Sequence, residues 1–105
     1  MTLVRVRGQS TPGAVAGAIA GLVRKQEPVE VQAIGASAVN QAVKALAIAC
    51  RLLEDDPEPV GLVFAPKFVE LEIEGKEVAA VRLTVLQMSP PSSPRPTLRV
   101  DTVAD

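Results

Sequence analysis

The sequence predicts an α/β fold of the α+β sandwich type, with two helices on one face of a mixed sheet. Three observations predict it: two segments have helical periodicity, a short strand-like segment precedes each of them, and two longer alternating segments flank a glycine further along. The resulting order is β-α-β-α-β-β, in which each strand–helix–strand connection returns the chain to one sheet. With 105 residues, 48% of them hydrophobic, the chain is long enough for one compact domain.

The first strand and the first helix are expected at residues 2–7 and 12–25. Apolar residues alternate with two arginines in the strand, which indicates a basic exposed face. Thr11 can cap the helix, and Pro12 suits its first position. The expected core-facing arc consists of Ala14, Val15, Ala18, Ile19, Leu22 and Val23. The opposite arc consists of small residues, alanine and glycine. Another backbone is therefore expected to pack closely against Gly17 and Gly21.

The second strand is expected at residues 29–34, and Gly35 then turns the chain into a helix at residues 36–54. At 100° per residue, the core arc of this helix consists of Val39, Ala42, Val43, Leu46, Cys50 and Leu53. A narrow polar strip consists of Asn40, Lys44 and Arg51. A third, apolar arc makes the apolar surface wider than one sheet face requires, which indicates a subunit interface at Ala45, Ile48 and Leu52.

The C-terminal half is expected to contain a short strand and a hairpin. Residues 60–65 form the short strand, which Pro66 ends. The hairpin consists of residues 68–73 and 76–88, joined by a three-residue loop that pairs Glu72 with Lys76. This register places one set of apolar residues on a common face: Val69, Leu71, Ala79, Val81 and Leu83.

The predicted domain covers residues 1–88, and residues 89–105 are a proline-rich tail. The tail has no periodic apolar face, so we expect it to be extended or mobile and dispensable for folding. Its alternating apolar residues also permit an additional strand at Leu98, Val100 and Val103.

Composition excludes several classes of function. The chain has no His and one Cys, which excludes zinc clusters, haem sites, CxxC pairs, histidine triads and internal disulfides. Aromatic residues make up 2%, too few for a base-stacking platform. Asp55, Asp56 and Glu58 could hold a calcium or magnesium ion, but acidic side chains in a proline-containing loop are usually exposed to solvent. We therefore expect no metal, no cofactor and no enzymatic activity.

The sequence has no signal peptide pattern and no apolar run near the roughly 20 residues that a membrane span needs. A cytoplasmic location without membrane contact is therefore expected.

Charge is unevenly distributed along the chain. The net charge is −1, but residues 1–52 carry six basic and two acidic groups, whereas residues 53–105 carry five basic and ten acidic groups. This asymmetry favours either an anion-binding surface in the N-terminal half or head-to-tail association between copies.

Three segments closely resemble the stage V sporulation protein S family: residues 10–21 (STPGAVAGAIAG), 31–36 (VQAIGA) and 39–45 (VNQAVKA). The resemblance extends over about residues 3–86. This family is associated with the regulation of sporulation and cell development, and it is similar in fold to the dimeric Alba-type nucleic-acid-binding proteins. The resemblance therefore implies the same β-α-β-α-β-β topology. A homodimer or higher homo-oligomer is expected because Ile48 and Leu52 would otherwise be exposed apolar surface.

The resemblance also implies a binding surface made of the loop after the first strand, the start of the second helix and the hairpin. Alba-type proteins place Lys and Arg in the first two regions, whereas this chain has amides and hydroxyls there and acids at its hairpin tip. Nearby cations supply the remaining candidates. The candidate nucleic-acid-binding residues are Arg5, Arg7, Gln9, Ser10, Asn40, Gln41, Lys44, Arg51 and Lys67.

The favoured hypothesis is a homo-oligomeric regulator that binds DNA or RNA weakly and electrostatically, mainly through the N-terminal half. The alternative is a protein–protein adaptor that binds no nucleic acid, in which the polar strip is an ordinary solvated helix face. An enzyme is the least favoured of the three. Salt-dependent retention on nucleic acid distinguishes the first two, because counterion release makes phosphate binding steeply dependent on salt.

Overall fold

Six elements follow one another in the order β-α-β-α-β-β, with the strands expected at residues 60–65 and 68–73 joined into one, and the α+β sandwich is confirmed. The structure is a computed structural model that describes residues 1–90 and 103–104, so the tail predicted at residues 89–105 and its possible extra strand lie almost wholly outside the described residues. The elements are β1 (Thr2–Val6), α1 (Pro12–Arg24), β2 (Val29–Ala33), α2 (Ala36–Glu54), β3 (Gly61–Ile73) and β4 (Lys76–Met88).

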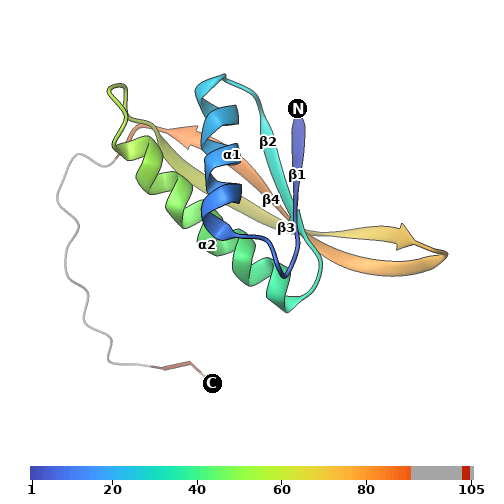
Figure 1. Ribbon diagram of the computed structural model, residues 1–105. Coiled ribbons are helices and arrows are strands. Elements are labelled where there is room, and N and C mark those ends of the chain that lie inside the picture. Colours follow the sequence, from blue (N-terminus) through green and yellow to red (C-terminus); the bar gives the residue numbers. More distant parts are fainter. Residues whose placement is uncertain (91–102, 105) are drawn as a thin grey trace.

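The four strands form one mixed sheet in the order β1-β2-β4-β3. β2 is parallel to β1 and antiparallel to β4, and β4 is antiparallel to β3. Both helices lie on the same side of this sheet (Figure 1), and their buried residues form the core together with one face of the strands. The other face of the sheet has no covering layer among the described residues, and none of the described helices is long and apolar enough to cross a membrane.

α1 begins at Pro12 as predicted, and it ends in a Schellman motif. Thr11 occupies the N-cap position, but its side chain makes no capping hydrogen bond. At the other end, the amide of Gln26 donates to the carbonyl of Val23, and the amide of Glu27 donates to that of Leu22. Gln26 has a φ of 62°, the left-handed conformation that this motif requires and that glycine adopts most readily.

The predicted core face of α1 is partly wrong. The residues buried in this helix are Ala16, Ile19, Ala20 and Val23, whereas Ala14 and Ala18 are exposed. The reason is that α1 packs mainly against α2 rather than against the sheet, so its small arc turns inward. The expected packing of a backbone on Gly17 and Gly21 is also absent, because no described atom from another element lies within 4 Å of a Cβ built at either position.

α2 has the predicted bounds, but the side that it buries is rotated. Ala45, expected at a subunit interface, is fully buried in the core, and Val43, expected in the core, is 54% exposed. α2 contacts both α1 and the strands, so its buried arc is displaced toward Ala45 and Ala49. Gly35 precedes the helix with φ 87° and ψ 159°, a conformation that is essentially restricted to glycine.

Pro66 does not end a strand, contrary to the prediction. β3 runs continuously through it, with Pro66 opposite Leu83 of β4. β3 is an edge strand, and a proline is tolerated there because its missing amide leaves no partner strand unsatisfied.

The hairpin loop has two residues rather than three. Glu74 and Gly75 both have positive φ (52° and 79°), as in a type I′ turn, and Ile73 pairs with Lys76. Glu72 therefore lies opposite Glu77, and the predicted pair with Lys76 is wrong. The predicted common face divides in two: Val69 and Leu71 share a side with Val78 and Ala80, whereas Ala79, Val81 and Leu83 lie on the side of the helices.

The Schellman motif predicts a stabilising substitution. Gln26→Gly should raise the free energy of unfolding by about 0.5–1 kcal/mol, because glycine adopts the left-handed conformation without a Cβ clash. Lys25→Gly is the matched control and should lower stability, since Lys25 has an ordinary φ of −86°. Urea unfolding measures both, and a lower stability of the Gln26 variant would contradict this account.

Two glycines should respond to alanine in opposite directions. Gly35→Ala should destabilise the fold by about 1–3 kcal/mol, because its backbone conformation is strained for any residue with a Cβ. Gly17→Ala should stabilise it by about 0.5–1 kcal/mol, because this helical glycine has open space at its Cβ position. Thermal unfolding of the two variants compares them directly, and a shift in the same direction for both would disprove the assignment.

Candidate functional site

A row of polar side chains crosses the uncovered face of the sheet, with one residue from each strand. The strand register places Arg5 opposite Gln32, Gln32 opposite Arg82, and Arg82 opposite Lys67. Directly opposite residues share a face of a sheet, and alternate residues on each strand face the other way. The neighbours Val31 and Leu83 are buried under the helices, so the row faces away from them. Three cations therefore lie in this row.

Arg82 is held in the row by side-chain hydrogen bonds. Its Nε donates to Oε1 of Gln32 at 3.2 Å, and its Nη2 donates to the same oxygen. Gln32 is only 8% exposed, so the acceptor is fixed by its surroundings. Arg82 was not among the residues predicted for the site, because its partner Gln32 is 50 positions away in the chain.

Glu30 partly neutralises the row. Its carboxylate lies 3.9 Å from both Nζ of Lys67 and Nε of Arg82, and it accepts a hydrogen bond from Thr84 at 3.2 Å. Every other strand position on this face of the four strands is occupied by a basic or neutral residue. The predicted candidate Lys67 therefore lies in the row, although it shares one carboxylate with Arg82.

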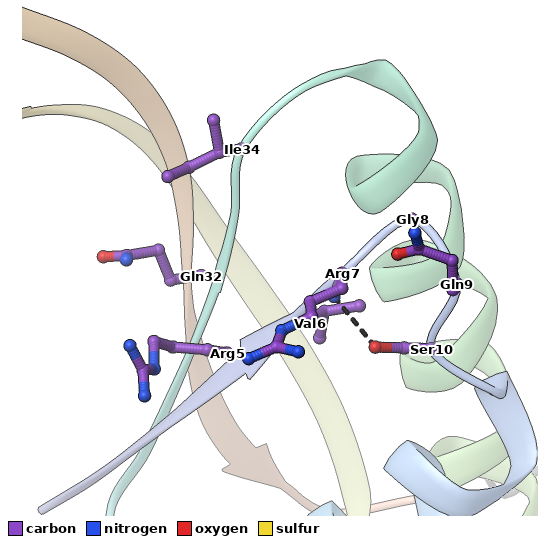
Figure 2. A pocket seen from close by; sticks show the side chains of 8 residues that line it. All are labelled: Arg5, Val6, Arg7, Gly8, Gln9, Ser10, Gln32 and Ile34. Atoms are coloured by element: carbon purple, nitrogen blue, oxygen red, sulfur yellow. Dashed lines mark hydrogen bonds between the residues drawn. The ribbon is translucent and has the colours of Figure 1, made fainter. Parts of the chain in front are cut away.

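The row ends at a hollow of about 770 Å³ that contains four of the predicted residues. Figure 2 shows the side chains of Arg5 and Gln32 directed to the same side. Within residues 1–90, neither Arg5 nor Arg7 forms an ion pair. The lining residues are Arg5, Val6, Arg7, Gly8, Gln9, Ser10, Gln32 and Ile34.

The loop at this hollow is held against the start of α2. Oγ of Ser10 accepts a hydrogen bond from the amide of Arg7 at 2.8 Å, as Figure 2 shows, and Nε2 of Gln41 donates to the carbonyl of Ser10 at 3.0 Å. Gly8 is also close to this helix, because a Cβ there would lie 2.8 Å from Oγ of Ser37. Gln41, predicted to bind nucleic acid, thus positions the loop with its amide nitrogen.

The remaining candidates lie on a different surface. Asn40, Lys44 and Arg51 are exposed on α2, which covers the opposite face of the sheet from the row. Asn40 and Arg51 are separated by about 16 Å along the helix axis at 1.5 Å per residue. The nine predicted residues therefore do not form one site, and the hollow and the row combine only those from β1, the following loop and β3.

The acidic loop after α2 has a structural contact. Both carboxylate oxygens of Asp56 accept hydrogen bonds from Arg24, at 2.9 and 3.0 Å, which ties the end of α1 to this loop. These hydrogen bonds lower the pKa of Asp56 below its usual value. Among the described residues, no group of three or more His, Cys, Asp or Glu side chains is placed to hold a metal ion.

The chain matches a known protein family over most of its length. The profile of the family described as Stage V sporulation protein S (SpoVS) matches residues 2–88. The match includes β1, the loop at the hollow, both helices and the whole hairpin.

The role of Gln41 predicts a stability effect. Gln41→Ala should lower the free energy of unfolding by about 1 kcal/mol, because it removes a hydrogen bond to a partly buried carbonyl. Gln9→Ala is the matched control, since Gln9 is exposed and makes no comparable contact within residues 1–90. Thermal unfolding should separate the two variants, and equal melting temperatures would mean that the loop does not depend on Gln41.

Proposed function

The chain belongs to the stage V sporulation protein S family and is a small sporulation-related protein, and from this premise we propose that it acts as a homo-oligomeric regulator that binds nucleic acid. The proposed role is regulatory rather than catalytic. The proposed binding surface is the open face of the sheet, with the row of Arg5, Arg82 and Lys67 and the adjoining Arg7.

The observation that carries this proposal is the pair of arginines at the hollow that no described carboxylate neutralises. An arginine without an internal partner is free to exchange its water and counterions for phosphate oxygens. Arg82 and Lys67 extend the positive surface across all four strands, a width of about 14 Å at 4.8 Å per strand spacing. This width corresponds to several phosphates of a duplex.

The surface favours contacts with phosphates over contacts with bases. Both aromatic residues, Phe64 and Phe68, occupy the opposite face of β3, so no ring is available for stacking beside the row. Amide and guanidinium groups remain, and these bind phosphate and sugar oxygens. We therefore expect weak, salt-sensitive binding with little preference for sequence.

A protein–protein adaptor is the second candidate, and one observation favours it. Leu3, Val63 and Leu86 are exposed on the same open face, at the end away from the hollow. Exposed apolar groups of this kind are suited to a protein partner. Such a contact would depend little on salt, so the salt series below separates the two functions.

The proposed function predicts a steep and localised salt dependence. Gel-shift titrations at 50 and 200 mM salt should give a slope of log affinity against log salt near −4 to −5 for a DNA duplex and near −3 to −4 for a single-stranded RNA, if about four to six phosphates are neutralised. Arg5→Glu should weaken binding to both nucleic acids and flatten both slopes. Replacing Lys25 by Glu is the matched control, because it is an exposed cation at the far end of α1, and it should change affinity much less.

Two results would overturn the proposal. One is the absence of retention on either nucleic acid at 50 mM salt, which would favour the adaptor. The other is an equal loss with the variants of Arg5 and Lys25, which would mean that overall charge, and not the open face of the sheet, determines binding.

A further inference from the structure

The hairpin extends beyond the body of the protein as a two-stranded arm. β2 pairs with β4 only from Val81 to Val85, so residues 69–73 of β3 and 76–80 of β4 pair only with each other, and Phe68 lies at the base of this arm. Figure 1 shows the arm leaving the sheet on the side away from the covering helices. It is about 17 Å long at 3.3 Å per residue. A lone two-stranded ribbon is marginally stable in water, so contacts from another surface would stabilise it.

One side of the arm concentrates negative charge. Glu70, Glu72 and Glu77 share this side, and Glu72 lies directly opposite Glu77 in the register. Like charges that are directly opposite destabilise a strand pair. Lys76 lies on the other side of the arm and does not compensate them. Phe68 is on the acidic side and is 79% exposed, so the side combines carboxylates with an uncovered ring.

The outer surface of α2 has the complementary chemistry. Lys44 and Arg51 are exposed and lie seven residues apart, on one strip of the helix about 10 Å long. Ile48 (38% exposed) lies between them, and Leu52 (39% exposed) lies one turn beyond Ile48 on the same side of the helix. No acidic residue occurs in this helix before its last residue, Glu54. The strip therefore has two cations, one on either side of Ile48. These groups are complementary to the glutamate carboxylates and the phenylalanine ring on the acidic side of the arm.

The two surfaces do not meet within one molecule. The arm points away from the helices (Figure 1), and within residues 1–90 none of the three carboxylates forms an ion pair. A second copy supplies the missing partner, because each chain carries both surfaces and a two-fold arrangement forms the contact twice.

We propose that the acidic side of the arm of one copy docks on the α2 strip of a second copy, and that the second copy's arm docks reciprocally. This inference rests on the homo-oligomeric part of the proposed function, and it is independent of nucleic-acid binding because the cationic row faces the other side of the sheet. It assigns Lys44 and Arg51 to subunit assembly rather than to phosphate.

Charge reversal tests the contact in the full chain. Sedimentation velocity should show that E70K/E72K and K44E/R51E each raise the dimer dissociation constant by about tenfold or more, since close charge pairs at interfaces contribute strongly. Mixing the two variants should restore the dimer, because each arm then meets a strip of opposite charge. The chain that combines all four substitutions should also dimerise. The matched control K76E, on the other side of the arm, should leave the dissociation constant within about twofold.

The outcomes distinguish this inference from the proposed function. Circular dichroism melting confirms that each variant is folded before its mass is measured. An unchanged dimer in both reversed variants, or a loss that mixing does not restore, would overturn the arm contact and would assign the interface to the exposed apolar end of the open sheet face. A wild-type chain that stays monomeric at all concentrations would overturn the homo-oligomer as well, while retention of that chain on nucleic acid would still support the phosphate surface.

Discussion

Both helices lie on one face of the sheet because the chain moves across it in the same direction twice. The order β1-β2-β4-β3 takes the first crossover from β1 to β2 and the second from β2 past β4 to β3. Crossovers of one hand that move in one direction fall on one side. The other face must then be compatible with solvent by itself, and the charged row provides this. The position of the candidate site is thus a consequence of topology, and the buried alanines of both helices allow a close helix layer on the remaining face.

Local signals predicted the elements, but pairing across the sheet was not predictable in the same way. Pro12 and Gly35 mark the starts of the helices in the sequence, and both helices begin where these residues indicate. The hairpin register depends on Glu74, which adopts a left-handed conformation that its residue type does not signal. Pro66 became compatible with a strand only once that strand was placed at the edge of the sheet. Helical periodicity gives the angles between side chains but does not show on which sides the helix contacts other elements. For this reason Val43 was predicted to be buried and is exposed, whereas Ala45 was predicted at a subunit interface and is buried in the core.

The site was predictable to the extent that its residues are adjacent in the chain. Arg5 in β1 and Arg7 directly after it are close in the chain, and the loop that follows was identified as part of the surface. Arg82 was missed because only the pairing of β2 with β4 brings it beside Gln32. Gln41 was assigned to ligand binding because the family resemblance placed the start of the second helix in the binding surface, and the structure shows that its amide nitrogen donates to the carbonyl of Ser10. Sequence patterns show which residue types are available, and long-range register decides which of them meet.

The proline in β3 has a consequence for how copies of this protein associate. β3 is long and lies at the edge of the sheet, which leaves one side of its backbone unpaired by any described strand. Such edges are templates for the addition of further strands and for the growth of fibres. Pro66 lies near the middle of this edge and offers no amide to an incoming strand. The pairing of an added strand would be interrupted at Pro66. This proline therefore protects the protein, at high concentration, against open-ended aggregation through the edge of its sheet.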